Sequence, residues 1–219
     1  METLSAQSLV DQGRVSDPGS PRGRLLSKAA GLFREKGYER TTVRDLAAAV
    51  GIQSGSIFHH FRSKEEILKA VMIETIHLIT ARMDSAIGAT DDPLEQLRAL
   101  IRCELESVHG ETGEAMAVLV YEWRSLSPQS QRDVLSLRDV YEELWLGLLQ
   151  RIREYGLLRA RPFVVRRLLA GALSWTSTWY RPGGEISLDD LASQVMATLQ
   201  LPSSLSAAAD ARPLDSGVE

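Results

Sequence analysis

The sequence predicts an all-α protein of about nine helices, three short ones in helix–turn–helix order followed by a larger helical domain. Apolar residues recur at helical spacing through most of residues 22–201, and capping residues or prolines precede the apolar runs. No stretch alternates apolar and polar residues as a half-buried strand does.

Three short helices are expected at the N-terminal side. The first covers about 22–36 and ends at Gly37, a residue suited to the C-terminal cap of a helix. Thr42 and Asp45 form a capping-box-like start for the second, which Gly51 breaks because the turn needs a positive φ. The third carries the apolar residues that are expected to point inward: Ile57, Phe58 and Phe61.

Six further helices are expected in the larger domain. They begin at capping or proline signals near residues 63, 92, 112, 127, 162 and 187. The predicted domains are a mobile tail over 1–20, a helix–turn–helix domain over 21–68, a helical domain over 69–201, and a second mobile tail over 202–219.

The composition excludes several classes of protein. With 44% hydrophobic and 25% charged residues, the 219-residue chain is neither disordered nor fibrous. Its single cysteine, Cys103, excludes an intramolecular disulfide and a cysteine-rich zinc site. Neither a signal peptide nor a membrane-spanning run is recognised, so a cytoplasmic location is expected.

The charge is unevenly distributed along the chain. The whole chain carries −4, but residues 22–65 hold nine Lys or Arg against four Asp or Glu, a balance of +5. The remainder is acidic. A short basic segment in helix–turn–helix order indicates a surface for nucleic acid, although a helical hairpin that only packs has the same spacing.

Residues 33–67 read FREKGYERTTVRDLAAAVGIQSGSIFHHFRSKEEI, which closely resembles the DNA-binding domain of TetR-type repressors. The resemblance implies a homodimer that reads the two half-sites of a double-stranded operator and pairs through its last two helices, about 162–180 and 187–200. It also implies DNA-binding residues, phosphate-contacting or base-facing: Thr42, Arg44, Gln53, Ser54, Gly55, Ser56, His59, His60 and Lys64. Where the family usually has Tyr, Phe58 is expected to serve mainly in packing.

The larger domain resembles a branch of that family that senses acyl-CoA thioesters, on the run LSWTSTWYRPGGEISLDDLA at 173–192. The resemblance implies a small-molecule effector and no cofactor. The candidate effector-binding residues are Trp123, Arg124, Tyr141, Trp175 and Trp179, with a basic mouth from Arg159, Arg161, Arg166 and Arg167. Aromatic residues at helical spacing are also typical of a core or a dimer interface.

An enzyme of another class is the alternative. The tetrads Glu74–His77 and Glu106–His109 have the E-x-x-H spacing of di-iron helical bundles. Helical phase places both tetrads away from the apolar face of their helices, which predicts solvated side chains and no metal. The sequence therefore favours a DNA-binding regulator over an enzyme.

Overall fold

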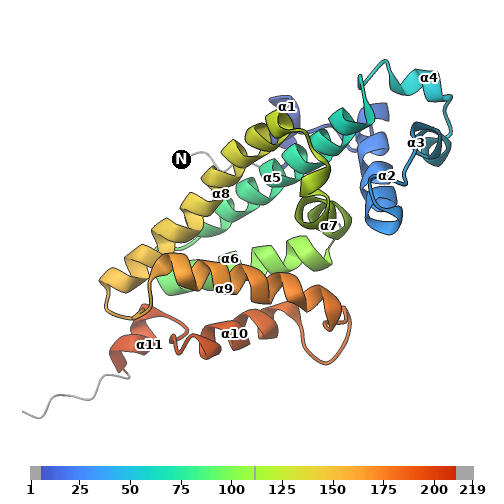
Figure 1. Ribbon diagram of the computed structural model, residues 1–219. Helices are drawn as coiled ribbons and strands as arrows, with labels where there is room; N and C mark the ends of the chain where they lie inside the picture. Colours follow the sequence, from blue (N-terminus) through green and yellow to red (C-terminus); the bar gives the residue numbers. More distant parts are fainter. Residues whose placement is uncertain (1–5, 111, 211–219) are drawn as a thin grey trace, which may run out of the picture. The chain divides into compact units, whose positions relative to one another are not determined.

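The computed structural model describes residues 6–110 and 112–210, and these form eleven α-helices, two 3₁₀ turns and no strand (Figure 1). Helices α2 to α10 correspond to the nine predicted helices, and α1 and α11 are additional. The helices are α1 (Ala6–Asp11), α2 (Pro21–Lys36), α3 (Val43–Val50), α4 (Ser54–Ile57), α5 (Lys64–Gly88), α6 (Pro93–His109), α7 (Gly113–Tyr121), α8 (Pro128–Glu154), α9 (Pro162–Trp175), α10 (Leu188–Thr198) and α11 (Leu205–Asp210).

The chain divides into two compact units. The first unit comprises the residues up to Arg82 and Ser107–Glu142, and the second comprises Met83–Glu106 and the residues from Glu143 on. This division differs from the predicted domain boundary at residue 68, because much of α5 packs into the same core as α2.

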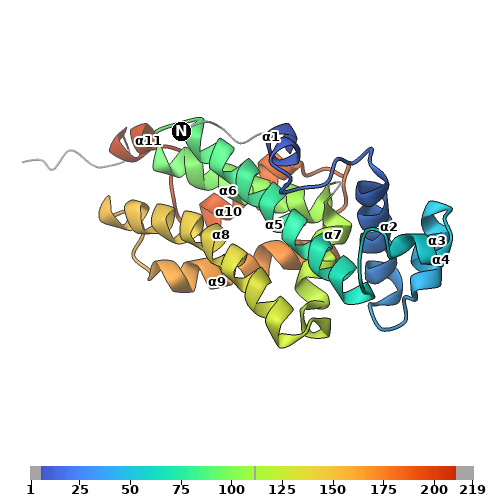
Figure 2. The same ribbon diagram turned by 90° about the horizontal axis from the view of Figure 1, so that it is seen from above.

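The core of the first unit joins the three short helices to α5. Figures 1 and 2 both show α2, α3 and α4 beside one another. Buried side chains from all four helices and from α7 and α8 form one cluster, which includes Phe33, Leu46, Ile57, Leu68, Met72, Val118 and Val134. This shared burial fixes the helix–turn–helix against the first part of α5.

The turn between α3 and α4 has the geometry that the sequence predicts. Gly51 is left-handed at φ 72°, and its N–H donates to Ala48 O at 3.2 Å while the Ile52 N–H donates to Ala47 O at 3.0 Å. These two bonds are those of a Schellman cap, in which glycine is favoured at the left-handed position. The predicted role of Gly51 is confirmed.

Replacing Gly51 by alanine is expected to destabilise the protein by about 1 kcal/mol, because a Cβ is strained at positive φ. Urea unfolding measures the change. Gly147→Ala in α8 is the matched control, since a Cβ there meets nothing within 4 Å, and about 0.5 kcal/mol of stabilisation is expected. Equal effects at the two positions would contradict a strained turn.

The second unit is a helical bundle with an apolar core. Its buried side chains come from the end of α5 and from α6, α8, α9 and α10, and include Met83, Leu97, Ile101, Leu148, Val165, Leu173, Ala192 and Met196. Ser187 and Asp190 form a capping box at the predicted start of α10: the Asp190 N–H donates to Ser187 Oγ at 3.1 Å, and the Ser187 N–H donates to the Asp190 carboxylate at 3.1 Å.

The two terminal segments differ from the predicted tails. In the described part of 1–20, residues 6–11 form α1, and Leu9 of α1 and Val15 after it are buried against α5. In the described part of 202–219, α11 follows a contact in which the Leu205 N–H donates to the Asp92 carboxylate at 2.7 Å. Such short segments carry too few apolar residues to show a periodicity, and long-range contacts order them.

Candidate nucleic-acid interface

The reading segment consists of α3, the Gly51 turn and α4. Helix α4 has only four residues and then tightens, because the N–H groups of residues 58 to 60 donate to carbonyls three residues earlier. Thr42, Arg44, Gln53, Gly55, His59 and His60 are exposed, and Ser54, Ser56 and Lys64 are half-buried. Of the nine predicted DNA-binding residues, five lie in helices: Arg44 in α3, Ser54, Gly55 and Ser56 in α4, and Lys64 at the start of α5. Thr42 and Gln53 are the N-cap residues of α3 and α4, and His59 and His60 follow the end of α4.

The prediction that Phe58 packs inward is wrong. Ile57 and Phe61 are buried, whereas 55% of Phe58 is exposed. Residues 57 and 61 are four apart and share one side of a helical turn, and Phe58 lies about 100° away from Ile57. An apolar ring therefore accompanies the small polar residues on the outer side of α4.

Lys64 has partners inside the protein. Its Nζ donates to the Tyr38 carbonyl at 2.7 Å and lies 4.0 Å from the centroid of the Tyr38 ring. Burial, with the nearby Glu65 and Glu39 charges, raises the pKa of the Tyr38 hydroxyl. Lys64 therefore also anchors the start of α5 to the loop after α2.

The capping box at Thr42 is confirmed. The Asp45 N–H donates to Thr42 Oγ1 at 3.1 Å, and the Thr42 N–H donates to the Asp45 carboxylate at 2.8 Å. These hydrogen bonds from Thr42, with a smaller effect of Lys36, hold the pKa of Asp45 below its ordinary value. The box fixes the N-terminus of α3, whose remaining N–H groups suit phosphate oxygens.

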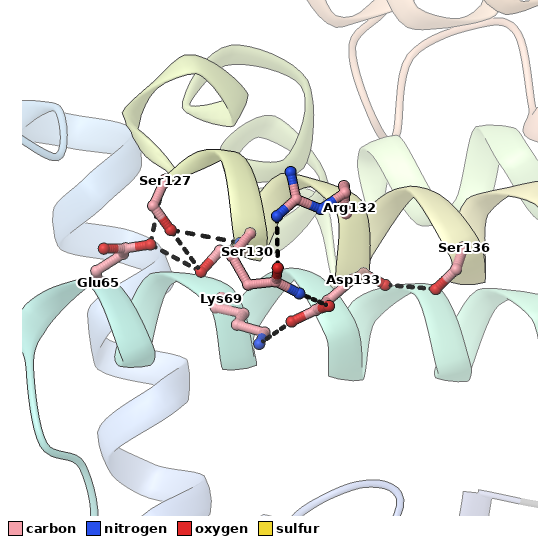
Figure 3. A network of polar contacts seen from close by, with 8 residues as sticks. Glu65, Lys69, Ser127, Ser130, Arg132, Asp133 and Ser136 are labelled. Atoms are coloured by element: carbon pink, nitrogen blue, oxygen red, sulfur yellow. Dashed lines mark hydrogen bonds and ion pairs between the residues drawn. The ribbon is translucent and has the colours of Figure 1, made fainter.

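The beginning of α5 is tied to the beginning of α8 by a polar network (Figure 3). The Glu65 carboxylate accepts from Ser127 N at 3.0 Å and from Ser130 Oγ at 2.7 Å, and these bonds lower its pKa. One turn along α5, Lys69 forms an ion pair with Asp133 at 2.5 Å. The contacts hold the first turns of α5 and α8 together.

Two basic residues escaped motif analysis. Arg24 and Lys28 on α2 line a surface hollow of about 340 Å³ together with Ala49 and Val50 at the end of α3. Both cations are exposed. Their charge appears in the sequence as part of the basic segment, but only the packing of α2 on α3 places them beside the helix–turn–helix.

The candidate effector residues fall in both units. Trp123, Arg124 and Tyr141 belong to the first unit, and Trp175 and Trp179 belong to the second. Trp175 is 66% exposed and Trp179 is 50% exposed, so neither lies in the core of the second unit.

Arg166 does not belong to a solvent-facing basic mouth. It is buried, its guanidinium pairs with Glu104 at 3.2 Å, and its Cζ lies 4.5 Å from the centroid of the Trp145 ring. The other three predicted arginines, Arg159, Arg161 and Arg167, are exposed. Adjacent arginines on a helix point to different sides, which separates Arg166 from Arg167.

The E-x-x-H tetrads make different contacts. Glu106 forms an ion pair with Arg102 at 2.9 Å. The Glu74 side chain is only 13% exposed and pairs with Arg22, so the expectation that it is solvated is wrong. Among the described residues, no three His, Cys, Asp or Glu side chains are grouped to hold a metal ion.

His77 makes the stability of the first unit depend on pH. Burial, followed by the nearby Arg14 charge, lowers its pKa below 6.5, and Glu74 opposes this shift. Below about pH 6.5, His77 is therefore protonated in the unfolded chain more readily than in the folded chain. The stabilisation from neutral His77 is complete above pH 6.5 and is lost as the pH falls through the folded-state pKa.

We expect the free energy of unfolding to fall between pH 7.5 and pH 5, and to fall less in a His77→Gln variant, as measured by urea titration. The amide keeps an acceptor for Arg14, whose guanidinium lies 3.0 Å from His77 Nδ1. An unchanged pH dependence in the variant would contradict this assignment.

Comparisons with known proteins cover both parts of the chain. Residues 25–71 match the family described as "Bacterial regulatory proteins, tetR family", and residues 90–200 match "Tetracyclin repressor-like, C-terminal domain". The HTH-type transcriptional repressor KstR2 of Mycolicibacterium smegmatis is 32% identical over 188 residues, which are 83% of this chain and 90% of that protein.

Two solved structures share the fold. A protein described as superantigen pfit is 55% identical, with a TM-score of 0.79 over 88% of this chain and 96% of its own. AibR in complex with isovaleryl coenzyme A and operator DNA is 23% identical, with a TM-score of 0.76 over 84% of this chain and all of its own. At that identity AibR shows the fold alone. No helix in the described ranges has the length and apolarity to cross a bilayer.

Proposed function

Because the chain belongs to the tetR family of bacterial regulatory proteins, we propose that it is a homodimeric transcriptional repressor released from its operator by a small effector. The helix–turn–helix carries this proposal: a Schellman turn at Gly51 presents exposed polar residues on α3 and α4 within a segment of charge +5. We place the protein in the cytoplasm and assign it no catalytic role.

The proposed DNA contacts divide by chemistry. Thr42, His59, His60 and Lys64 are assigned to phosphates, and Ser54, Gly55 and Ser56 are assigned to base edges in the major groove. The three base-facing residues have short side chains or none, so hydrogen bonds to bases are few, and the shape of the operator contributes to its recognition.

The proposed dimer interface is the exposed side of α9 with α10. Along α9 and the turn that follows it, Val164, Leu168, Trp175 and Trp179 are all exposed, and they are separated by four, seven and four residues, which is close to one or two helical turns. A stripe of large apolar side chains is costly in water and is typical of an interface between subunits.

The proposed effector is an acyl-CoA thioester. The likeness of residues 173–192 to the acyl-CoA-responsive branch supports this class, and AibR shows that a protein of this fold binds isovaleryl coenzyme A. An acyl-CoA has an apolar chain for aromatic residues and phosphates for exposed arginines. Its binding would favour a conformation in which the two reading segments no longer match the half-site spacing.

The test is a binding assay with DNA flanking the chain's own gene and unrelated DNA as competitor. The wild-type protein is expected to retard a specific fragment. Gly55→Glu is expected to lose this binding, because it places a carboxylate at the proposed DNA-facing surface. The variant should still fold, since a Cβ at Gly55 meets nothing within 4 Å. Acyl-CoA thioesters of increasing chain length should release the fragment, whereas free coenzyme A should not. Equal binding to both DNAs would refute the repressor, and no release by any thioester would refute the effector class.

A further inference from the structure

The carboxylate of Glu74, near the middle of α5, holds the segment that precedes α2. It accepts from the Ser16 N–H and the Ser16 hydroxyl, both at 2.9 Å, and forms an ion pair with Arg22. One turn further along α5, Arg14 contacts His77 Nδ1 at 3.0 Å. The first E-x-x-H tetrad is thus the attachment site for residues 14–22.

Apolar contacts reinforce this attachment. Leu9 of α1 and Val15 are buried with Ala81 of α5, and Leu78 packs against them. Segment 6–22, defined here as the strap, is therefore fastened to α5 by both buried apolar side chains and hydrogen bonds to a charged group. Hydrogen bonds of the latter kind are stronger than neutral ones.

The strap also contacts Phe61, which follows the reading segment and is hydrogen-bonded to its last residue. The guanidinium of Arg22, at the start of α2, lies 5.0 Å from the centroid of the Phe61 ring. Phe61 is buried, and its N–H donates to the carbonyl of Ile57, the last residue of α4. A groove of about 400 Å³ is lined by the strap residues Gly13 and Arg14, by His60 and Phe61, and by Ile73 of α5. A continuous path of contacts therefore runs from Glu74 through Arg22 to the end of α4.

We propose that Glu74 is a positioning residue for DNA reading, which links the position of α5 to that of α4 through Arg22 and the strap. The proposal rests on the proposed function, because the reading segment must bind DNA for its position to matter. It gives the E-x-x-H tetrad of α5 a mechanical role in place of a metal-binding one.

The sign of the effect separates positioning from simple electrostatics. Glu74→Gln removes a negative charge from the DNA-binding unit, and charge alone would make DNA binding tighter. Loss of the ion pair with Arg22 would instead loosen α4 and weaken binding. The salt dependence of operator affinity should not change, since no phosphate contact is removed.

The experiment compares Glu74→Gln with Glu106→Gln, the same change in the second tetrad, where the carboxylate pairs with Arg102 within α6. We expect Glu74→Gln to weaken operator binding about tenfold with an unchanged salt slope, and Glu106→Gln to leave it unchanged. Hydrogen exchange of residues 54–61 in the DNA-free protein should accelerate only in Glu74→Gln. Ser16→Ala keeps the ion pair between Glu74 and Arg22 and should give a smaller effect of the same sign. It replaces Glu74→Gln as the test variant if that protein does not fold.

Operator binding by Glu74→Gln that equals or exceeds wild type would overturn the proposal, as would unchanged exchange at 54–61. Failure of the wild-type protein to bind any DNA would refute the repressor instead. The exchange measurement needs no DNA, so the two failures remain distinguishable.

Discussion

Replacing Leu168 by glutamate is expected to convert the dimer into monomers and to weaken operator binding about 100-fold or more. Leu168 lies on the exposed stripe of α9 with 70% of its surface accessible. In a two-fold interface the same patch meets its own copy, so one substitution brings two carboxylates into an apolar contact. Loss of the dimer then removes the second reading segment, whose binding is otherwise intramolecular.

Sedimentation and fluorescence anisotropy with operator DNA measure the two effects. Leu135→Glu on α8 is the matched control, because Leu135 is also exposed but lies in the first unit, outside the proposed interface. It should leave both the dimer and operator affinity intact. A Leu168→Glu protein that remains dimeric at micromolar concentration would show that α9 is not the interface.

Replacing Arg166 by alanine is expected to destabilise the protein by about 3–5 kcal/mol. Arg166 and Glu104 are both buried, and the substitution leaves the Glu104 carboxylate without its guanidinium in an apolar core. The cation–π contact with Trp145 is lost as well.

Urea unfolding measures this change, with two comparisons. Arg102→Ala removes an exposed arginine that pairs with Asp189 at 3.3 Å, and it should cost less than about 1 kcal/mol. The double variant Glu104→Leu, Arg166→Met removes both charges and should recover most of the stability. A double variant as unstable as Arg166→Ala would contradict an uncompensated charge as the cause.

Local sequence signals were sufficient for much of the fold. The capping box at Thr42, the helix start at Ser187 and the left-handed Gly51 depend on residues within four positions of one another, and the structure confirms each of them. Helical periodicity identified α2 to α10 for the same reason. The residue order of the helix–turn–helix then indicated a DNA-binding regulator, and the family comparisons confirm that class.

The prediction of individual side chains was less successful. Phe58 was expected to point inward with Ile57 and Phe61, but it lies about 100° away from Ile57 around the turn and is exposed. Glu74 lies opposite the main apolar face of α5, but the strap covers that side and removes it from solvent.

The helices, their caps, the reading segment and the class of protein can be predicted from the sequence, because they follow from interactions between residues that are close along the chain. Which charges are buried and which segments are ordered depends on contacts between residues that are far apart in the sequence. Arg166 and Arg167 are adjacent and chemically identical, yet only Arg166 meets Glu104, 62 residues away. The strap likewise acquires its structure from α5, since burial against a distant helix supplies what six residues of local helix cannot.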